Sequence, residues 1–477
     1  MKQLLPLIVL LSYWSCGYNE NPAAGVLFAG EIVNPTNDYV VLYKNDKVVD
    51  SAKLDDNNRF KFRLNAVEEG LHHFDHAPQL QYIYLEEGDS VRIRLNASPA
   101  YFDESLTFSG DNEDINNFMI EMFLTYEDEE PLVYSFFKLP PKTFCDKIDS
   151  LRYQKLQEFE ALSQSENISP RALAMAKAAV DYHSFLYKEK YPFYHKMHTG
   201  EEIILQLDAD FYRHRSLLNF NNEDLSYFRP YYDFMKYYFK NLAYVSCSQQ
   251  CGHNDLHFPK KQLHLNKHKI AMIDSLVETP DLRDNLLRNV AMDYLLKVHT
   301  ANKDCDSFIA KFEDLSSNEA HITEIKDLYN GIKKLQPEEE LPHLVLENVR
   351  GESITLKEIA DKTNTVFYFW TADQKRHFRN VSRRIDRLKK AYPKHQFIGI
   401  NLRTNRKEWL SLLNEGEGPL MFGEQYRSPD FKTTQNTLIV DHLNKCIVAK
   451  KTRIIDGFAN VYTSFDAQQE KHKLKMP

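Results

Sequence analysis

The chain has few glycines and none of the standard motifs for phosphate binding or hydrolysis. It contains 15 Gly in 477 residues, so glycine-rich loops that cradle phosphates are scarce. The patterns G-x-x-x-x-G-K-[ST], G-x-S-x-G and H-E-x-x-H do not occur. These absences argue against P-loop nucleotide chemistry, a hydrolase nucleophile elbow and zincin-type proteolysis, and we expect no cofactor.

An excess of positive charge is also missing. Lys and Arg number 60 against 68 Asp and Glu, which gives a formal net charge of −8, and the basic residues are dispersed among acidic ones. Nucleic-acid binding depends on neutralising phosphates with clustered cations. We therefore expect no nucleic-acid partner.

Long apolar runs are absent except at the start, where the chain reads "MKQLLPLIVLLSYWSCGYNENP". The run from Leu4 to Trp14 is too short to span a bilayer but is typical of the apolar part of a secretory signal. It stops at Ser15-Cys16-Gly17 and so resembles a bacterial lipoprotein signal, in which Cys16 is acylated, although Tyr13 stands where an aliphatic residue is usual. The alternative is an ordinary cleaved signal. We expect residues 1–16 to be the signal, 17–25 a tether, and the protein to be lipid-anchored in the cell envelope, on the periplasmic side or in the outer membrane.

Cysteine is scarce as well, with five residues beyond Cys16. An odd number in an oxidising compartment predicts at least one buried, unpaired thiol. The densest Cys/His segment, "CSQQCGHNDLHFPKKQLHLNKH", begins with Cys247 and Cys251. Three interpretations stay open: a local disulfide between these two, ordinary surface thiols and histidines, or a metal site that uses ligands among His253, His257, His264 and His268. The disulfide is preferred, and no metal is assigned.

The rest of the chain shows three successive patterns of apolar and polar residues. Residues 26–114 alternate apolar and polar side chains with period two between short turns, which predicts an antiparallel β-sandwich. Residues 115–335 show helical periodicity with recurring Tyr and Phe, which predicts an all-α region whose aromatic residues form the core; Ser169-Pro170 is a good helix start. Residues 336–341 are a charged linker, and 342–477 alternate strands and helices.

The last region gives a definite order of elements. We expect strands at His343–Leu346, Thr365–Trp370 and Gln396–Leu402, helices at His377–Tyr392 and Lys407–Leu413, a hairpin of Thr437–Val440 with Cys446–Lys450, and a helix from Gly457 to the end. The whole chain is thus expected to be an α+β multidomain protein.

Several sequence blocks in this region are similar to one family. "LPHLVLENVRGESITLKEIADK", "VFYFWTADQKRHFRNVSRRIDRLKKAYP", "QFIGINLRTNRKEWLSLL" and "TLIVDHLNKCIVAK" resemble the TlpA/ResA-type branch of the thioredoxin fold, found in secreted bacterial proteins. The resemblance covers Leu341 to about Phe465. Upstream, "FAGEIV", "VVDSAKLDDNNRFKF", "YLEEGDSVRIRL" and "FSGDNEDINNFM" resemble the β domain that precedes such modules in Bacteroidetes lipoproteins. The resemblance implies a C-terminal thioredoxin-like α/β domain.

The family's chemistry, however, is missing at the matching positions. The resemblance places its two redox cysteines at Gln374 and His377, neither of which can attack a disulfide, and its cis-proline at Gln435. A non-proline cis bond costs roughly 2.5–4 kcal/mol, so we expect Gln435 to be trans. Asp373 is a reasonable helix N-cap, and Lys375 and Arg376 bring positive charge that an anion could use.

We therefore predict a redox-inactive thioredoxin-fold envelope lipoprotein that acts as a binding or scaffolding module for a protein or peptide, with docking near Lys432–Asn436 as one route. The alternative, implied by the family resemblance, is a thiol–disulfide oxidoreductase of the cell envelope. A third hypothesis is a metal- or anion-binding protein that uses residues 247–268.

Overall fold

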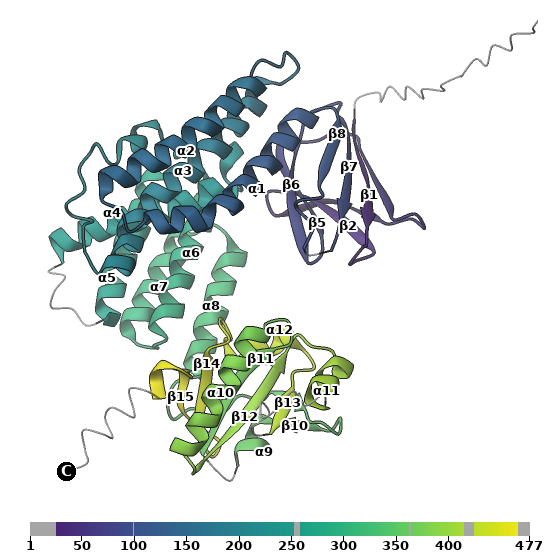
Figure 1. Cartoon of the computed structure of the whole chain (residues 1–477). Coiled ribbons are helices and arrows are strands. Elements are labelled where there is room, and N and C mark those ends of the chain that lie inside the picture. The colour runs from purple at the N-terminus through teal and green to yellow at the C-terminus, as the bar shows by residue number, and fades with distance from the viewer. Residues whose placement is uncertain (1–24, 99, 252–257, 362–363, 415–423, 466–477) are drawn as a thin grey trace, which may run out of the picture. The chain divides into compact units, whose positions relative to one another are not determined.

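The computed structural model describes residues 25–98, 100–251, 258–361, 364–414 and 424–465 (Figure 1). The signal segment with Cys16, nearly all of the predicted tether, His253 and His257 lie outside these residues. The chain divides into two compact units, one of residues 1–218 with 222–234 and one of 219–221 with 235–477. The division falls within helix α4 (Arg229–Gln250). The division into three domains, expected from the changing pattern of apolar and polar residues, stays a prediction.

The first unit opens with eight strands. They are β1 (Val26–Val33), β2 (Tyr39–Lys44), β3 (Lys47–Lys53), β4 (Arg59–Leu64), β5 (Gly70–His76), β6 (Gln79–Leu85), β7 (Ser90–Asn96) and β8 (Thr107–Gly110). They form two four-stranded sheets, in the orders β4-β1-β7-β8 and β3-β2-β5-β6. Phe28 and Phe62 of the first sheet share one apolar core with Phe74 and Ile83 of the second. The two sheets therefore make a sandwich.

One strand pairing differs from the expected wholly antiparallel sandwich. β1 runs parallel to β7, with Leu27 opposite Ser90 and Val33 opposite Asn96, while it runs antiparallel to β4. Five strands separate β1 from β7 along the chain, so their connection is a crossover and not a hairpin. Period-two alternation reports which face of a strand is buried and says nothing of strand direction, which is why the sequence pattern missed this pair.

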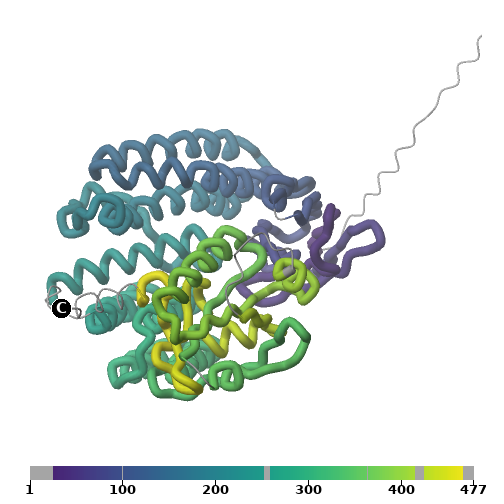
Figure 2. The backbone as a smooth tube through the Cα atoms, turned by 60° about the horizontal axis from the view of Figure 1, so that its bottom comes forward, coloured from purple at the N-terminus to yellow at the C-terminus, as the bar shows by residue number. Residues whose placement is uncertain are grey.

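Three long helices follow in the same unit: α1 (Glu113–Phe136), α2 (Pro141–Leu162) and α3 (Pro170–Thr199), and then the short 3-10 turns η1 (Arg213–Leu217) and η2 (Glu223–Leu225). Figure 2 shows the three helices, in blue, packed against one another. The predicted start at Ser169-Pro170 is confirmed, because the Ser169 hydroxyl accepts a hydrogen bond of 3.0 Å from Ala172 N.

The second unit combines helices with one mixed sheet. Its helices are α4 from residue 235 on, α5 (Phe258–Leu276), α6 (Pro280–Val298), α7 (Lys303–Leu315), α8 (Glu319–Lys334), α9 (Leu356–Ala360), α10 (Lys375–Ala391), α11 (Arg406–Asn414) and α12 (Phe431–Leu438). Its strands are β9 (Val345–Glu347), β10 (Ser353–Thr355), β11 (Asn364–Thr371), β12 (His395–Leu402), β13 (Gln425–Arg427), β14 (Lys445–Lys450) and β15 (Arg453–Asn460).

The sheet has the order β10-β9-β13-β12-β11-β14-β15. β11, β12 and β13 are parallel neighbours, whereas β14 runs antiparallel to β11 and forms a hairpin with β15. α10 connects β11 to β12 and packs against both (Figure 1). Val366 and Trp370 of β11 share a core with Ile385 of α10 and Trp409 of α11. This core holds the strand-to-helix junction in place.

Two elements near the C-terminal end differ from expectation. The predicted strand Thr437–Val440 is instead the end of α12 and the two residues after it, and residues from Gly457, predicted to be helical, complete β15. The hairpin is therefore β14 with β15, one element later than predicted. Residues 466–477 of the predicted last helix lie outside the described residues.

Candidate functional site

The junction between β11 and α10 is the position at which the sequence resemblance places redox chemistry. β11 is buried along its length from Thr365 to Thr371, as its apolar composition requires. The Trp370 ring stacks on Phe378 of α10 at 4.3 Å between centroids, and its indole N–H donates a 3.0 Å hydrogen bond to Gln425. The stacked aromatic pair thus holds the end of β11 against the beginning of α10.

The start of α10 is not capped as predicted. Gln374 is the N-cap residue, and no side chain there bonds to the helix amides. Asp373 lies one residue earlier, where its carboxylate accepts a 3.1 Å hydrogen bond from Gln374 N. Asp373 fails as N-cap because the helix starts at Lys375, one position later than that role requires.

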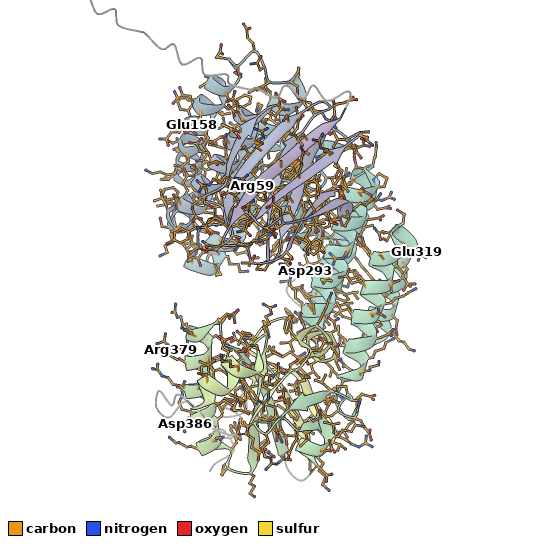
Figure 3. The ribbon with its side chains drawn as sticks, turned by 90° about the vertical axis from the view of Figure 1, so that its right-hand side faces the viewer. Arg59, Glu158, Asp293, Glu319, Arg379 and Asp386 are labelled. Carbon is orange, nitrogen blue, oxygen red and sulfur yellow. The ribbon has the colours of Figure 1, made fainter. Side chains whose placement is uncertain are left out.

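The junction opens onto a wide depression with a basic rim. It is lined by Asp373, Gln374, Lys375, Arg376, His377, Arg379, Asn380, Asn444 and Tyr462. Charged side chains continue along α10, and Figure 3 shows Arg379, at the depression, and Asp386, farther along, projecting from that helix. The structure therefore brings together all five predicted junction residues, from Asp373 to His377.

His377 is the most enclosed of these residues. Neither ring nitrogen has a hydrogen-bond partner of good geometry, although both are shielded from solvent. Burial lowers the pKa of His377, and the side chain of Asn444 and the backbone of Leu443 oppose the shift only in part. The ring is therefore neutral at neutral pH and cannot serve there as a fixed positive charge for an anion.

The structure separates Gln435 from this junction. Gln435 lies inside α12, where its side-chain amide donates a 3.4 Å hydrogen bond to Val440 O, and it does not line the depression. The segment that precedes the hairpin and faces His377 is instead Asp441–Asn444. Gln435 is thus separate from the depression, and the placement of the family's cis-proline at this position stays a prediction of the sequence resemblance. Within the described ranges the one cis peptide bond is Ala77-Pro78.

The segment of the predicted peptide-docking route lies within α12. Lys432–Asn436 is helical, so this segment offers no open strand edge. Strand-like addition of a peptide at this segment is therefore not supported.

Cys446, which lies near the junction, and Cys145, which lies in the first unit, have thiols whose pKa is raised. None of the residues that line the depression is a cysteine. Cys446 of β14 pairs in register with Tyr368 of β11, and burial raises the pKa of its thiol strongly. Burial also raises the pKa of Cys145 in α2 to about 11. Reactive cysteines need a lowered pKa, so neither thiol has the environment of a redox nucleophile. The prediction of at least one buried thiol outside a disulfide is confirmed by Cys305 and Cys446.

The Cys/His segment is partly described. Cys247 and Cys251 carry thiols that are not joined in a disulfide in the structure, and the predicted bond between them stays a prediction. Of the four histidines considered with them, His268 is brought close, with Nε2 at 3.3 Å from the Cys251 sulfur.

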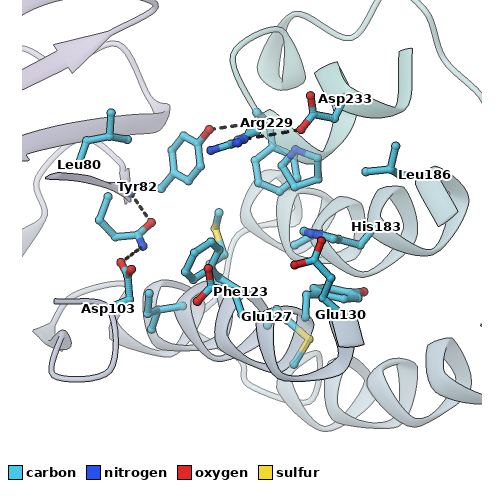
Figure 4. Close-up of a pocket in the computed structure, with 18 of the residues that line it drawn as sticks. Leu80, Tyr82, Asp103, Phe123, Glu127, Glu130, His183, Leu186, Arg229 and Asp233 are labelled. Atoms are coloured by element: carbon cyan, nitrogen blue, oxygen red, sulfur yellow. Dashed lines mark hydrogen bonds and ion pairs between the residues drawn. The ribbon is translucent and has the colours of Figure 1, made fainter. Parts of the chain in front are cut away.

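The first unit holds a cavity of about 430 Å³ that the sequence did not indicate (Figure 4). Its walls come from β6, the residues around Asp103, α1, α3 and the segment Phe228–Asp233. Apolar side chains such as Phe123 and Leu186 line it together with the acidic residues Asp103, Glu127, Glu130 and Asp233 and the cations Lys190 and Arg229. Volumes of this size suit small organic ligands.

Acidic groups set the electrostatics of this cavity. Burial and the neighbouring carboxylates, Asp103 first among them, raise the pKa of Glu127. His183 stacks on Tyr126 at 3.8 Å, and burial lowers its pKa to about 3, so it is neutral. Arg229 pairs with Asp233 at 3.6 Å. The cavity thus favours a ligand with a positive group and an apolar body. Glu127–Glu130, interpreted from sequence as a solvated charged run, contributes two of its wall residues.

Within the described residues, no helix has the length and apolar character needed to cross a membrane. No protein-family model matches the chain, and no curated protein matches it either.

Solved structures give partial likenesses. A thiol-disulfide oxidoreductase from Bacteroides fragilis has 19% identity and a TM-score of 0.24, with 28% of this chain and 99% of that chain covered. The thioredoxin domain of a thiol-disulfide oxidoreductase from Bacteroides vulgatus has 14% identity and a TM-score of 0.24, with 29% and 98% covered. A thiol peroxidase from Chromobacterium violaceum has 13% identity and a TM-score of 0.25, with 29% and 87% covered. At these values the likenesses carry no argument about what this chain does.

Proposed function

We propose that the chain is a redox-inactive, lipid-anchored protein of the bacterial cell envelope whose thioredoxin-like part binds a partner without exchanging disulfides. The observation that carries the proposal is the pair Gln374 and His377 at the start of α10, where disulfide exchange requires two thiols. An amide and a neutral imidazole cannot form a mixed disulfide. The alternative, an envelope thiol–disulfide oxidoreductase, would need a nucleophile that this depression lacks among its described lining residues.

The assignment of the thioredoxin-like part is supported by strand order and direction. β11, α10 and β12 make a parallel crossover unit, and the antiparallel hairpin β14–β15 follows on the other side of β11. This is the order, strand–helix–strand–helix–hairpin, that the sequence blocks resemble. The lipid anchor at Cys16 and the envelope location are proposed from the signal segment alone.

The test is a disulfide-reduction assay with insulin as substrate on the soluble chain that starts at Gly17. We expect the native protein to be inactive and a Gln374→Cys/His377→Cys variant to gain activity, because the helix start then carries two thiols beside unsatisfied amides. A Cys247→Ser/Cys251→Ser variant is the control and should match the native protein. Native activity that this control abolishes would contradict the proposal and move the redox site to the helices. Incorporation of labelled palmitate that Cys16→Ser abolishes is the expected result for the anchor.

A second candidate function, supported by the acidic cavity of the first unit, is binding of a small cationic ligand with an apolar body. Phenethylamine and phenylacetate differ mainly in the sign of their charge and are suitable probes for isothermal titration calorimetry. We expect phenethylamine alone to bind, and Glu127→Gln to weaken it roughly two- to fivefold, the effect of removing about 0.5–1 kcal/mol of exposed ion pairing. Glu158→Gln, an exposed change on α2 outside the cavity, is the control. Equal binding of both probes, or no response to Glu127→Gln, would count against this candidate.

A further inference from the structure

Two cysteines and a histidine meet where α4 ends beside α5. Cys247 lies in the last turn of α4, and Cys251 follows that helix directly. His268 comes from α5. The sulfurs of Cys247 and Cys251 and one ring nitrogen of His268 all lie within 4.8 Å of one another, and the Cys251 sulfur is 3.3 Å from His268 Nε2.

Local backbone geometry disfavours a disulfide between the two cysteines. Cys251 N donates a 2.9 Å hydrogen bond to Cys247 O, so the pair is separated by one intact helical turn. Side chains four residues apart on a helix have Cβ atoms about 5–6 Å apart, whereas a disulfide needs about 3.5–4.5 Å. Closing the bond would require the last turn of α4 to unwind. The turn instead directs both sulfurs to the same side without joining them.

This separation suits a metal ion that bridges the two sulfurs. Zinc binds thiolate sulfur at about 2.3 Å and imidazole nitrogen at about 2.0–2.1 Å in a tetrahedral arrangement, which places neighbouring ligand atoms roughly 3.5–3.8 Å apart. The distances among the three ligand atoms, from 3.3 Å up to at most 4.8 Å, include that value. Small side-chain rotations therefore suffice to bring the three atoms to bonding distance of one ion. Two thiolates and an imidazole are also ligand types that zinc prefers.

A second contact orients the histidine for this role. The hydroxyl of Ser246 lies 3.4 Å from His268 Nδ1. A histidine that donates from Nδ1 to an oxygen presents the lone pair of Nε2 to its other side, which is the usual second contact of a metal-ligating histidine. Here that other side is the Cys251 sulfur.

We propose that Cys247, Cys251 and His268 bind one zinc ion, with Ser246 as a positioning residue for His268. The described residues supply three protein ligands, and the fourth position of a tetrahedral ion would take a further ligand, such as water. The site belongs to the helical part of the second unit, and it is independent of the redox-inactive junction at α10.

The experiment is a zinc titration of the metal-stripped, reduced chain from Gly17, in competition with a chromophoric chelator. We expect one equivalent of zinc to bind. Cys251→Ser and His268→Gln should each weaken binding by more than roughly a hundredfold, since even the loss of a second contact of a ligating histidine costs about 10- to 100-fold. Ser246→Ala should weaken it roughly tenfold, and Ser246→Thr, which keeps a hydroxyl, should restore it.

Matched controls distinguish zinc binding at this site from nonspecific zinc binding by other thiols and histidines of the chain. His264→Ala changes the histidine one turn earlier on α5, and Cys145→Ser removes a thiol from α2; both should bind like the native chain. Cobalt substitution should produce a thiolate-to-cobalt charge-transfer band that Cys251→Ser reduces and His264→Ala does not. Circular dichroism of each variant shows whether its helices are intact. The proposal is overturned by the absence of stoichiometric binding, by binding that Cys251→Ser and His268→Gln leave unchanged, or by equal loss in His264→Ala.

Discussion

Lys445, the first residue of β14, gives the sharpest test of the electrostatics of the second unit. Its side chain is 1% exposed. The ammonium donates hydrogen bonds to Leu438 O at 2.7 Å and Ile439 O at 2.9 Å, and it lies 3.9 Å from the centre of the Phe458 ring. It thereby caps the end of α12, where Ile439 has the left-handed backbone angle φ of 46°. Burial lowers the pKa of Lys445 from 10.5 to about 7, opposed by the negative charge of Asp441.

The sign of the pH effect follows from proton binding. Between pH 7 and 10.5 the folded chain holds Lys445 mainly neutral while the unfolded chain holds it protonated, so the unfolded state binds more protons and stability rises with pH. The slope is at most about 1.4 kcal/mol per pH unit, and from pH 7 to 9 the gain is roughly 2 kcal/mol. Below pH 7 both states are protonated and this dependence fades.

The assay is urea unfolding at pH 7, 8 and 9, followed by tryptophan fluorescence. The chain from Gly17 retains two tryptophans, Trp370 and Trp409, and both are fully buried in the second unit. The Lys445→Met variant should lose the rise of roughly 2 kcal/mol between pH 7 and 9, while Lys450→Met, an exposed change on the same strand, should keep it. Parallel pH profiles for native protein and Lys445→Met would refute the reasoning, because they would mean that Lys445 stays charged in the folded state.

Two further predictions concern the first unit and are checked by urea unfolding with circular dichroism. Glu189 is fully buried, and Arg215 donates hydrogen bonds of 2.8 and 2.7 Å to its carboxylate. Arg215→Met should therefore lower the free energy of unfolding by about 3–5 kcal/mol, because it leaves the buried charge without this partner. A decrease below about 1 kcal/mol would show that the carboxylate is solvated. Gly110 has φ of +99°, and an added Cβ would lie 2.2 Å from Ser90 O, whereas Gly88, at φ of +89°, has open space around it. Gly88→Ala should therefore cost about 1–2 kcal/mol of backbone strain, and Gly110→Ala clearly more; equal losses would contradict the predicted clash.

The junction of β11 and α10 was predictable because strong local signals define it. The apolar run Val366–Trp370 makes a buried strand, and the basic helix begins at Lys375, two residues before the predicted His377. Both ends are set by local composition. The redox-inactive interpretation rests on residue identities at Gln374 and His377, which sequence alone supplies.

The hairpin was misplaced because a short apolar run fits two structures. Thr437–Val440 has strand composition, but Thr434 and Leu438 are buried on one face of a helix that Asp430 caps at its start. Strand β15 passes close to a distant segment, since a Cβ added at Gly457 would lie 2.2 Å from Leu335 O, just after α8. No local pattern reports such a contact.

The two candidate binding sites could not be predicted from the sequence for the same reason: each is built from residues that are far apart in the chain. The spacing of Cys247 and Cys251 is visible in the chain, but the approach of His268 to them depends on how α5 lies beside α4. The acidic cavity draws its wall from segments as far apart as Leu80 and Asp233. Only folding brings such residues together.

The position of β1 within its sheet has a mechanical consequence. β1 is bonded along one edge to β4, from Val26 to Glu31, and along the other to β7, from Leu27 to Val33. Ten peptide steps from Cys16 to Val26 reach at most about 35 Å, so a protein anchored at Cys16 would keep Val26 within that distance of the lipid surface. Tension on such an anchor would reach the sandwich first at β1, and both ladders, to β4 and to β7, would have to break before this strand could leave the sheet. The sandwich would thus resist unfolding at β1, the strand to which the force is applied.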